Sequence, residues 1–167
     1  SVNLISGSLP PSGGDIRFDG RSVAALPISE RVPLGLARTF QTTSVFAEYS
    51  ALEQVLTACH ARYRSGAFAA VLQRAAARRE AVEQREKAAG ILEFVGLAEV
   101  AGEPASALSS AQQRLLMIAT ALATEPRLLL LDEPAAGMVA SERKALAELI
   151  LRIRGRGIAV LVIEHHM

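Results

Sequence analysis

Apolar residues gather in short unbroken runs in the last third of the chain. Residues 128–131 are four consecutive leucines, and residues 158–163 are all aliphatic. Strands that are apolar on both faces are typical of a parallel sheet covered on both sides. The amphipathic stretch 141–154 between the two runs has helical spacing, so this third predicts an alternation of strand and helix. Such an alternation favours a layered α/β core in which helices join parallel strands.

The first forty residues predict a series of short elements. A turn dipeptide, Asp19-Gly20, separates two short polar–apolar alternations, which is typical of a β-hairpin within residues 14–23. Residues 2–9 are small and apolar and run into two prolines, so we expect the end of a helix there. A short helix capped by Ser29 and then a strand are expected over residues 28–40.

The middle of the chain has the apolar spacing of helices. From residue 50 to about residue 100 apolar side chains recur at helical intervals, which predicts a helical insert in the α/β core. Residues 62–87 carry a local excess of basic side chains, which fits either a solvated helix face or a surface that docks a partner. Ser109 can cap a further helix that ends before Pro126.

Composition places the chain among folded proteins and excludes several classes. Its 167 residues are 50% hydrophobic, enough for about one domain with a sizeable core. The formal net charge of +1 gives no electrostatic reason to expect nucleic acid. Every apolar run is far too short to cross a bilayer, so an integral membrane protein is not expected. Cys59 is the single cysteine and cannot form an internal disulfide, which favours a reducing, cytoplasmic compartment.

The two ends of the chain lack features of natural termini. The chain begins at Ser1 within an apolar stretch and stops at Met167, directly after an expected strand. It has no initiator methionine and no basic segment followed by an apolar stretch, the pattern of a signal peptide. We therefore expect a piece of a longer protein, incomplete at both ends.

Two adjacent carboxylates, Asp132 and Glu133, follow the four leucines of the expected strand. Ligands bind open α/β sheets at the carboxyl ends of the strands. Neighbouring like charges are costly unless a cation or a reacting water uses them. One carboxylate can therefore hold Mg²⁺ while the other polarises an attacking water. The alternative is that both belong to a helix N-terminus and are simply solvated.

Three further positions offer polar groups where strands end or a helix begins. Ser109 opens a helix whose hydroxyl, backbone N–H groups and positive dipole suit a phosphate, although an ordinary N-cap has the same features. Gln41 ends one expected strand and His165 follows another, and each alone is as typical of a structural role. Zinc at His165 and His166 is not expected, because adjacent side chains on a strand point apart and no third ligand has suitable spacing.

The order of these groups resembles the ATP-binding subunits of ABC transporters. The family's motifs match in sequence: the Q-loop at Gln41, the signature motif at residues 108–112, the Walker B pair at Asp132 and Glu133, the D-loop at residues 135–141 and the H-switch at His165. Four longer strings are similar to the branched-chain amino-acid importer branch: residues 37–41, 121–126, 132–138 and 163–165. The resemblance covers essentially the whole chain.

The resemblance implies a fold class. It is α/β: a P-loop NTPase (RecA-like) parallel-sheet core with an inserted ABC helical subdomain and a small antiparallel β element. Residues 1–41 and 108–167 would belong to the core, which includes the hairpin at residues 14–23, and residues 42–107 would form the helical subdomain. The whole chain, residues 1–167, would then be a partial ABC ATPase domain.

The resemblance also implies ATP and Mg²⁺ as cofactors, with two ATP molecules sandwiched between two subunits. Asp132 and Gln41 would attend Mg²⁺. Glu133 would be the general base for the attacking water, and His165 would contact the γ-phosphate. The signature residues would bind the partner subunit's nucleotide across the interface: Ser109, Ser110, Ala111 and Gln112.

By the same resemblance, the parent protein is the ATP-hydrolysing subunit of a bacterial importer of branched-chain amino acids. Its expected partners are a second ABC ATPase subunit, identical or different, a membrane permease gripped by the helical subdomain and, indirectly, a periplasmic solute-binding protein. This places it peripherally on the cytoplasmic face of the inner membrane, without nucleic acid. The alternatives are a urea or amide importer, a soluble ABC ATPase of translation or DNA repair, and an inactive regulatory module.

Two features depart from the family pattern. The 167 residues contain no G-x-x-x-x-G-K-[ST] motif, the loop that cradles the phosphates, so we expect this chain to be inactive alone. Ala111 stands where the signature usually has glycine, and its methyl group hinders close approach of the backbone to a phosphate. We therefore expect the parent protein to be a slow or asymmetric ATPase.

Overall fold

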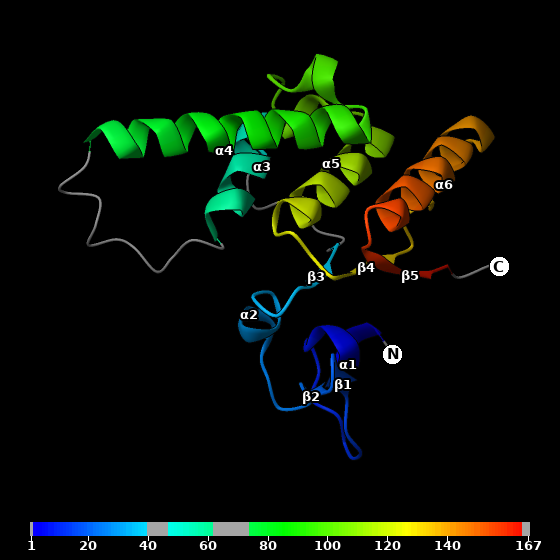
Figure 1. Cartoon of the computed structure of the whole chain (residues 1–167). Coiled ribbons are helices and arrows are strands. Elements are labelled where there is room, and N and C mark those ends of the chain that lie inside the picture. Colours follow the sequence, from blue (N-terminus) through cyan, green and yellow to red (C-terminus); the bar gives the residue numbers. More distant parts are fainter. Residues whose placement is uncertain (1, 40–46, 62–73, 165–167) are drawn as a thin grey trace. The chain divides into compact units, whose positions relative to one another are not determined.

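A computed structural model describes three stretches of the chain: residues 2–39, 47–61 and 74–164. The chain divides into two compact units, whose elements are labelled in Figure 1. The core unit contains Ser1–Phe40 and Glu125–Met167, and the helical unit contains Gln41–Thr124. The helical unit is therefore a contiguous insertion between two separate segments of the core unit.

The core unit is built on a three-stranded sheet with the strand order β3-β4-β5 (Figure 1). Its strands are β3 (Leu36–Arg38), β4 (Leu128–Asp132) and β5 (Ala159–Ile163). Both pairings are parallel, with Leu36 opposite Leu128 and Asp132 opposite Ile163. The parallel sheet predicted from the apolar runs is thus confirmed. Because the strands are parallel, their carboxyl ends lie at one edge of the sheet.

Two helices pack against this sheet. α1 (Val2–Ser6) contacts β3 and β4, and its Val2 is buried in a cluster with Leu36 and Leu130. α6 (Ala140–Gly155) joins β4 to β5 and contacts β5. The expected alternation of strand and helix in the last third is confirmed, and it produces the layered core.

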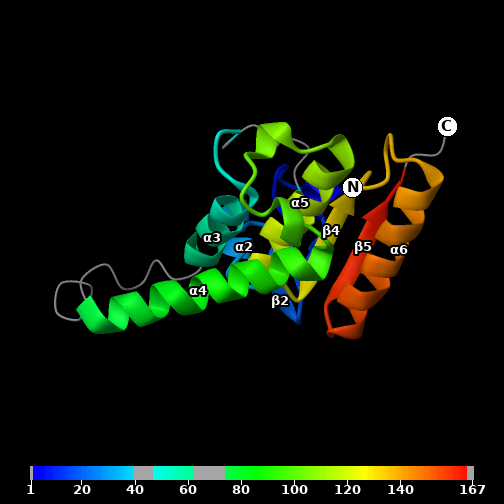
Figure 2. The ribbon, with the colours of Figure 1, turned by 90° about the horizontal axis from the view of Figure 1, so that it is seen from above.

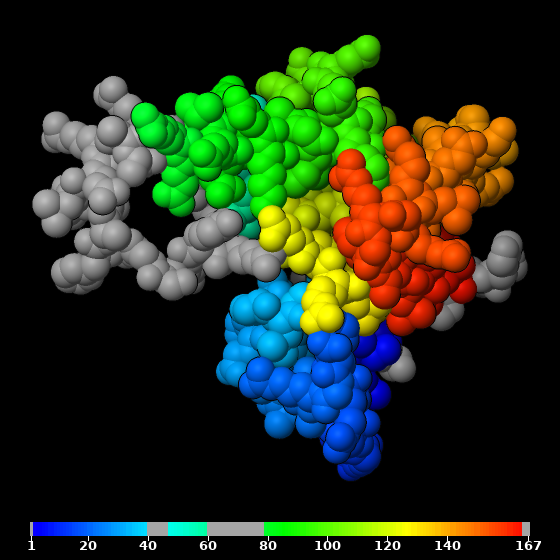
Figure 3. Space-filling model, viewed as in Figure 1, coloured from blue at the N-terminus to red at the C-terminus, as the bar shows by residue number. Residues whose placement is uncertain are grey.

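The strands β4 and β5 differ in burial. Leu129, Leu130 and Leu131 of β4 are at most 1% exposed, as expected for a strand covered on both faces. Leu161 and Val162 of β5 are each 38% exposed, so among the described residues this strand has less cover than β4. Figure 3 shows β5 and α6, coloured orange to red, at the surface. β5 is the last strand in the order and pairs on one side only within the described residues.

A short antiparallel hairpin precedes β3. It consists of β1 (Arg17–Phe18) and β2 (Arg21–Ser22), as the sequence pattern predicted. Asp19 and Gly20 link the two strands with φ angles of 53° and 77°, both in the left-handed region. Two consecutive residues with positive φ are typical of the type I′ turn, whose twist matches that of paired strands.

The next element, α2 (Ile28–Arg31), is a single short turn of helix. Pro27 occupies its N-cap position and makes no side-chain cap bond, while Ser29 lies inside the helix. The expectation that Ser29 caps this helix is therefore wrong. Proline fits the N-cap position because the backbone there is extended and its missing N–H would have no intrahelical partner.

Arg31, the last residue of α2, ties this segment to α1. Its guanidinium is buried and donates hydrogen bonds to four carbonyl oxygens: those of Leu4 (2.7 Å), Ile5 (2.7 Å), Leu26 (2.8 Å) and Ala24 (3.2 Å). Burial lowers the pKa of Arg31 from its ordinary value, and the four bonds offset the cost of removing the charge from water. Gly7 has a φ of 84°, and a Cβ atom there would lie 2.7 Å from the Arg31 Nε. Glycine is therefore required beside the guanidinium.

The described residues of the helical unit include three mutually packed helices (Figure 2). These are α3 (Ala51–Ala61), α4 (Arg74–Val95) and α5 (Ser110–Ala123), with the 3-10 turns η2 (Ala98–Val100) and η3 (Ala105–Ala107) between α4 and α5. Val55, Leu92 and Leu116 are buried in α3, α4 and α5. The helical pattern predicted for residues 50–100 is confirmed for the described residues 51–61 and 74–100, while residues 62–73 lie outside the described part of the chain. α5 contacts α3 and α4 and falls within the helical unit, whereas the order of motifs assigned residues 108–124 to the core; that functional assignment stays a prediction.

The longest of these helices is α4, with 22 residues. Its described surface alternates charges of both signs, with Arg79, Glu83 and Arg85 all exposed, around a half-exposed Val82. Among the residues that the structure describes, none of the helices combines the length and the apolar character needed to span a membrane.

Candidate functional site

The two adjacent carboxylates lie where β4 leaves the sheet. Asp132 is the last residue of β4, and Glu133 begins the turn that follows. Glu133 has a φ of 47°, a left-handed conformation that is uncommon for residues other than glycine. Its N–H donates a hydrogen bond to the carbonyl oxygen of Ile163 at 2.8 Å, so the end of β5 holds this turn in place. Both carboxylate side chains are partly exposed at the sheet edge.

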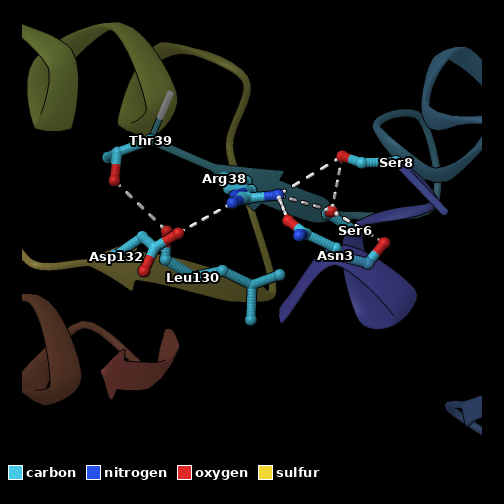
Figure 4. Close-up of polar contacts among 7 residues, drawn as sticks. All are labelled: Asn3, Ser6, Ser8, Arg38, Thr39, Leu130 and Asp132. Atoms are coloured by element: carbon cyan, nitrogen blue, oxygen red, sulfur yellow. Dashed lines mark hydrogen bonds and ion pairs between the residues drawn. The ribbon is translucent and has the colours of Figure 1, made fainter. Parts of the chain in front are cut away.

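Arg38, the last residue of β3, forms an ion pair with Asp132 (Figure 4). Its Nη2 lies 2.7 Å from Asp132 Oδ2, and the two side chains are only 14% and 21% exposed. Its Nη1 donates to three oxygens of the α1 segment: Asn3 Oδ1 at 2.7 Å, Ser6 Oγ at 3.0 Å and Ser8 Oγ at 3.3 Å. One guanidinium therefore joins the end of β4 to α1.

Thr39 continues the polar edge after β3. Its N–H and its hydroxyl both donate to the carbonyl oxygen of Leu130, at 3.0 and 3.4 Å. The backbone beyond β3 is thus held against β4 as it leads towards Gln41. Gln41 itself, the predicted Q-loop residue, lies outside the described residues, and so does His165.

Glu164 is the last described residue after β5. Its Oε1 accepts a hydrogen bond from the N–H of Ala135 at 3.1 Å. Together with the Glu133–Ile163 bond, this contact fastens the loop after β4 to the end of β5. Sequence reasoning assigned no role to Glu164, Arg38 or Asn3. The one available signal was a basic residue, Arg38, at the end of an otherwise apolar strand.

The second group of predicted residues opens α5 in the helical unit. Ser109 is the N-cap, and its Oγ accepts a hydrogen bond from the Gln112 N–H at 3.2 Å. Gln112 Oε1 in turn accepts from the Ser109 N–H at 2.9 Å, which completes a capping box. Gln113 Nε2 donates to the carbonyl oxygens of Ala105 and Leu108, both at 3.1 Å. The N-cap predicted at Ser109 is confirmed, and neighbouring side chains fix its geometry.

The start of α5 has the chemistry of an anion site. Ser109 and Ser110 are exposed, and Ala111 is partly buried in the first turn. Helix N-termini present unbonded N–H groups and the positive end of the helix dipole, both of which favour a phosphate. These residues belong to the helical unit, whereas Asp132 and Glu133 belong to the core unit.

The donor set at the end of β4 fits a particular kind of metal binding. No group of three or more His, Cys, Asp and Glu side chains in residues 2–39, 47–61 and 74–164 is placed to hold a metal. Mg²⁺ commonly binds through one or two carboxylates, with phosphate oxygens and water completing the shell. Asp132, a partly exposed carboxylate at a sheet edge, fits Mg²⁺ that arrives with a phosphate ligand.

Comparison with known families decides what this arrangement belongs to. A family model described as ABC transporter matches residues 1–136, which is most of the chain. The chain belongs to the ABC transporter family. The resemblance noted from the motifs is thereby confirmed for the family as a whole.

Curated relatives of the family match along nearly the entire chain. The high-affinity branched-chain amino acid transport ATP-binding protein LivG of Salmonella typhimurium is 39% identical over 166 residues. The corresponding protein BraF of Pseudomonas aeruginosa is 40% identical over 166 residues. Each match covers 99% of this chain and 65% of the relative, so the chain spans about two thirds of the relatives' length.

The fold agrees with that of solved family members. The crystal structure of an ATP-binding cassette of an ABC transporter, in its ADP conformation, matches with a TM-score of 0.80 and 28% identity. The match covers 99% of this chain and 65% of the cassette. The fold class predicted from the sequence, an α/β core with an inserted helical region, is therefore confirmed.

Proposed function

We propose that the protein is the ATP-hydrolysing subunit of a bacterial ABC importer for branched-chain amino acids. The observation that carries the proposal is the Asp132–Glu133 pair at the carboxyl end of the buried strand β4. Identities of 39 and 40% to LivG and BraF, over 99% of the chain, support the class of solute. ATP and Mg²⁺ are the cofactors that this function requires.

Asp132 and Gln41 are the residues proposed to hold Mg²⁺. Mg²⁺ held there would supply positive charge against the negative charge that develops on the phosphate in phosphoryl transfer. A carboxylate has two oxygens, so Asp132 can offer one to the metal while Oδ2 stays bonded to Arg38. The amide oxygen of Gln41 adds a neutral donor of the kind that Mg²⁺ accepts.

Glu133 is the proposed general base. Its carboxylate takes the proton of the attacking water as the water's oxygen bonds to the γ-phosphorus of ATP. The bond from that phosphorus to the β–γ bridging oxygen breaks, and ADP leaves with that oxygen. The backbone bond from Glu133 to Ile163 and the Ala135–Glu164 bond hold the turn, which fixes the starting point of the Glu133 side chain. His165, two residues beyond Ile163, is proposed to contact the γ-phosphate.

The signature residues 109–112 are proposed to bind the nucleotide of a second subunit, identical or different. The exposed Ser109 and the first N–H groups of α5 supply the anion site. In this geometry the Gln112 side chain is engaged in the capping box, so its support for the phosphate is indirect. Ala111 places a methyl group in the first turn, and its effect on turnover stays a prediction.

The remaining partners follow from the proposed role. The helical unit is the surface proposed for a membrane permease, because α4 presents a long exposed face with the half-exposed Val82 among charges of both signs. A periplasmic solute-binding protein would act through that permease. The subunit would then lie peripherally on the cytoplasmic face of the inner membrane.

The hydrolysis proposal is tested with the full-length product of the gene. Glu133→Gln should lower Mg²⁺-dependent ATP turnover by about 10² to 10⁴-fold, because the general base is lost while the shape is kept. Binding of ATP, measured by equilibrium dialysis, should remain. Glu99→Gln, at an exposed glutamate of the helical unit, is the matched control and should keep normal turnover. A Glu133→Gln variant that keeps more than a tenth of normal turnover would contradict the assignment.

The class of solute needs a test in cells. Deleting the gene should abolish most uptake of radiolabelled leucine, isoleucine and valine, and the intact gene should restore it while the Glu133→Gln gene should not. Loss of urea or amide uptake instead, with normal leucine uptake, would overturn the solute assignment and leave the ATPase assignment standing.

A further inference from the structure

We infer that Arg38 is a positioning residue for Asp132, which it fixes between the sheet edge and α1 so that one carboxylate oxygen is presented to Mg²⁺. This inference rests on the proposed function. The inference is based on the hydrogen bonds of one guanidinium, which Figure 4 shows. Its Nη2 donates to Asp132, and its Nη1 donates to three oxygens of the α1 segment.

The sheet register explains why Arg38 can reach Asp132. Arg38 is paired with Leu130 across the parallel strands β3 and β4, and Asp132 lies two residues further along β4. Side chains two residues apart on a strand point to the same face, so Leu130 and Asp132 share the face on which Arg38 lies. A long side chain at position 38 spans this diagonal, and the 2.7 Å contact is the result.

The α1 contacts fix the guanidinium on its other side. Asn3 Oδ1 lies 2.7 Å from Nη1, and the hydroxyls of Ser6 and Ser8 lie at 3.0 and 3.3 Å. Ser6 Oγ and Ser8 Oγ are also within 2.9 Å of each other, so the acceptors form one connected group. A planar guanidinium held at both nitrogens cannot swing, and the carboxylate bonded to it is held in turn.

The ion pair between Arg38 and Asp132 is strengthened because both side chains are largely buried. The Arg38 and Asp132 side chains are 14% and 21% exposed, so water competes weakly for either charge. The positive charge also offsets part of the repulsion between Asp132 and the adjacent Glu133. Groups that orient a metal-binding carboxylate in this way usually change metal affinity by about 10- to 100-fold when they are removed.

The test measures metal binding separately from hydrolysis. Mn²⁺ replaces Mg²⁺, and its binding to the full-length protein with a non-hydrolysable ATP analogue is followed by electron paramagnetic resonance. Arg38→Gln should weaken Mn²⁺ binding by about tenfold or more. Binding of the analogue in EDTA should stay within about twofold. Unchanged Mn²⁺ affinity would overturn the inference, and so would tighter binding, because tighter binding means that Arg38 competes with the metal.

Arg127→Gln is the matched control. Arg127 precedes β4 at the opposite end from Asp132 and forms an exposed ion pair with Asp19. Its loss should leave Mn²⁺ affinity unchanged. An equal loss of Mn²⁺ affinity in both variants would overturn the inference, because it would mark a general effect of removing a positive charge near β4.

Two further variants keep the inference falsifiable if Arg38→Gln does not fold. Asn3→Ala removes the shortest bond to Nη1 and leaves the Arg38–Asp132 pair, so it should weaken Mn²⁺ binding by a smaller factor. Arg38→Lys keeps the charge, but a single ammonium group cannot bond Asp132 and the α1 oxygens at once in the same fixed geometry. This variant should therefore also bind Mn²⁺ weakly. Full Mn²⁺ affinity in both variants would overturn the inference.

The outcome for the unsubstituted protein separates this inference from the proposed function. If that protein binds no Mn²⁺ with the analogue and hydrolyses no ATP, both the proposed function and the role of Arg38 are wrong. If it binds Mn²⁺ normally and Arg38→Gln binds it equally well, the role of Arg38 alone is wrong.

Discussion

The end of β4 in the core unit and the start of α5 in the helical unit are each stabilised by a different kind of contact. Asp132 is fixed by Arg38, 94 residues away in the chain, and Arg38 by Asn3, a further 35 residues back. Ser109 is fixed by Gln112, three residues away, through a reciprocal pair of hydrogen bonds. The first arrangement depends on the tertiary fold, whereas the second is complete within one turn of helix.

This difference determines how each region should respond to change. A local capping box contributes to one helix end, and its loss is confined there. A contact between distant segments helps to hold several packed elements together. Its removal should therefore lower the free energy of unfolding by more than the loss of a local cap does. Three substitutions, taken from the largest expected effect to the smallest, test this contrast.

The largest effect is expected at the long-range contacts of Arg31. Arg31→Met should lower the free energy of unfolding by about 3 kcal/mol or more, because four partly buried carbonyl oxygens lose their donor at once. Urea denaturation of the full-length protein measures the loss. Arg17→Met is the control: Arg17 is an exposed partner of Asp15, and its loss should cost no more than about 0.5 kcal/mol. Similar losses in both variants would contradict the contrast.

An intermediate effect is expected at the capping box of α5. Ser109→Ala should cost about 1 kcal/mol, because the Gln112 N–H loses its acceptor. Hydrogen exchange should speed up at the Gln112 amide and its neighbours in the first turn, with the amides of β4 unchanged. Ser109→Asn keeps a side-chain acceptor and should retain most of the protection. Faster exchange throughout β4 would show that the cap is not local.

The smallest effect is expected at the capping box of α3, and it depends on pH. Glu53 Oε2 accepts hydrogen bonds from the Ser50 N–H and hydroxyl, both at 2.8 Å. The backbone bond from Ser50, then the hydroxyl bond, lowers the pKa of Glu53 from its ordinary value of 4.5. The stabilisation is therefore present above 4.5 and is lost as the pH falls through the lower folded value.

Urea denaturation at several pH values between about 7 and about 3 tests this dependence. Wild type should lose its advantage over Glu53→Gln as the solution becomes acidic. Some acid sensitivity should remain in the variant, because hydrogen bonds from Ser22 and Arg17 also lower the pKa of Asp15. A constant difference between the two proteins across the range would show that ionised Glu53 does not strengthen the cap.

The same contrast explains which features were predictable from the amino-acid pattern. The hairpin at Asp19-Gly20, the cap at Ser109 and the parallel strand 128–131 depend on neighbours or on periodicity, and each was expected. The positions of the two carboxylates after β4 followed from the same pattern.

The features that could not be predicted depend on residues distant in the chain. Nothing close to Arg38 indicates that Asn3 and Asp132 are its partners, since the fold alone brings them together. The burial of Arg31 has the same cause in part, because two of its four acceptors, Leu4 and Ile5, lie in α1, 27 and 26 residues earlier. The place of β5 at the end of the described strand order is likewise not shown by its aliphatic sequence.

The insertion of the helical unit between β3 and β4 also imposes an order on folding during synthesis. β3 is complete at Arg38, but its partner strand begins only at Leu128, so the sheet cannot pair until the whole insertion has left the ribosome. Helical segments with nearby contacts fold quickly, and contiguous units generally fold as they emerge. The nascent chain therefore completes its middle before its beginning. Until then the apolar residues of β3 and α1 that pack on β4 are uncovered, and we expect a chaperone to bind the nascent chain there during this interval.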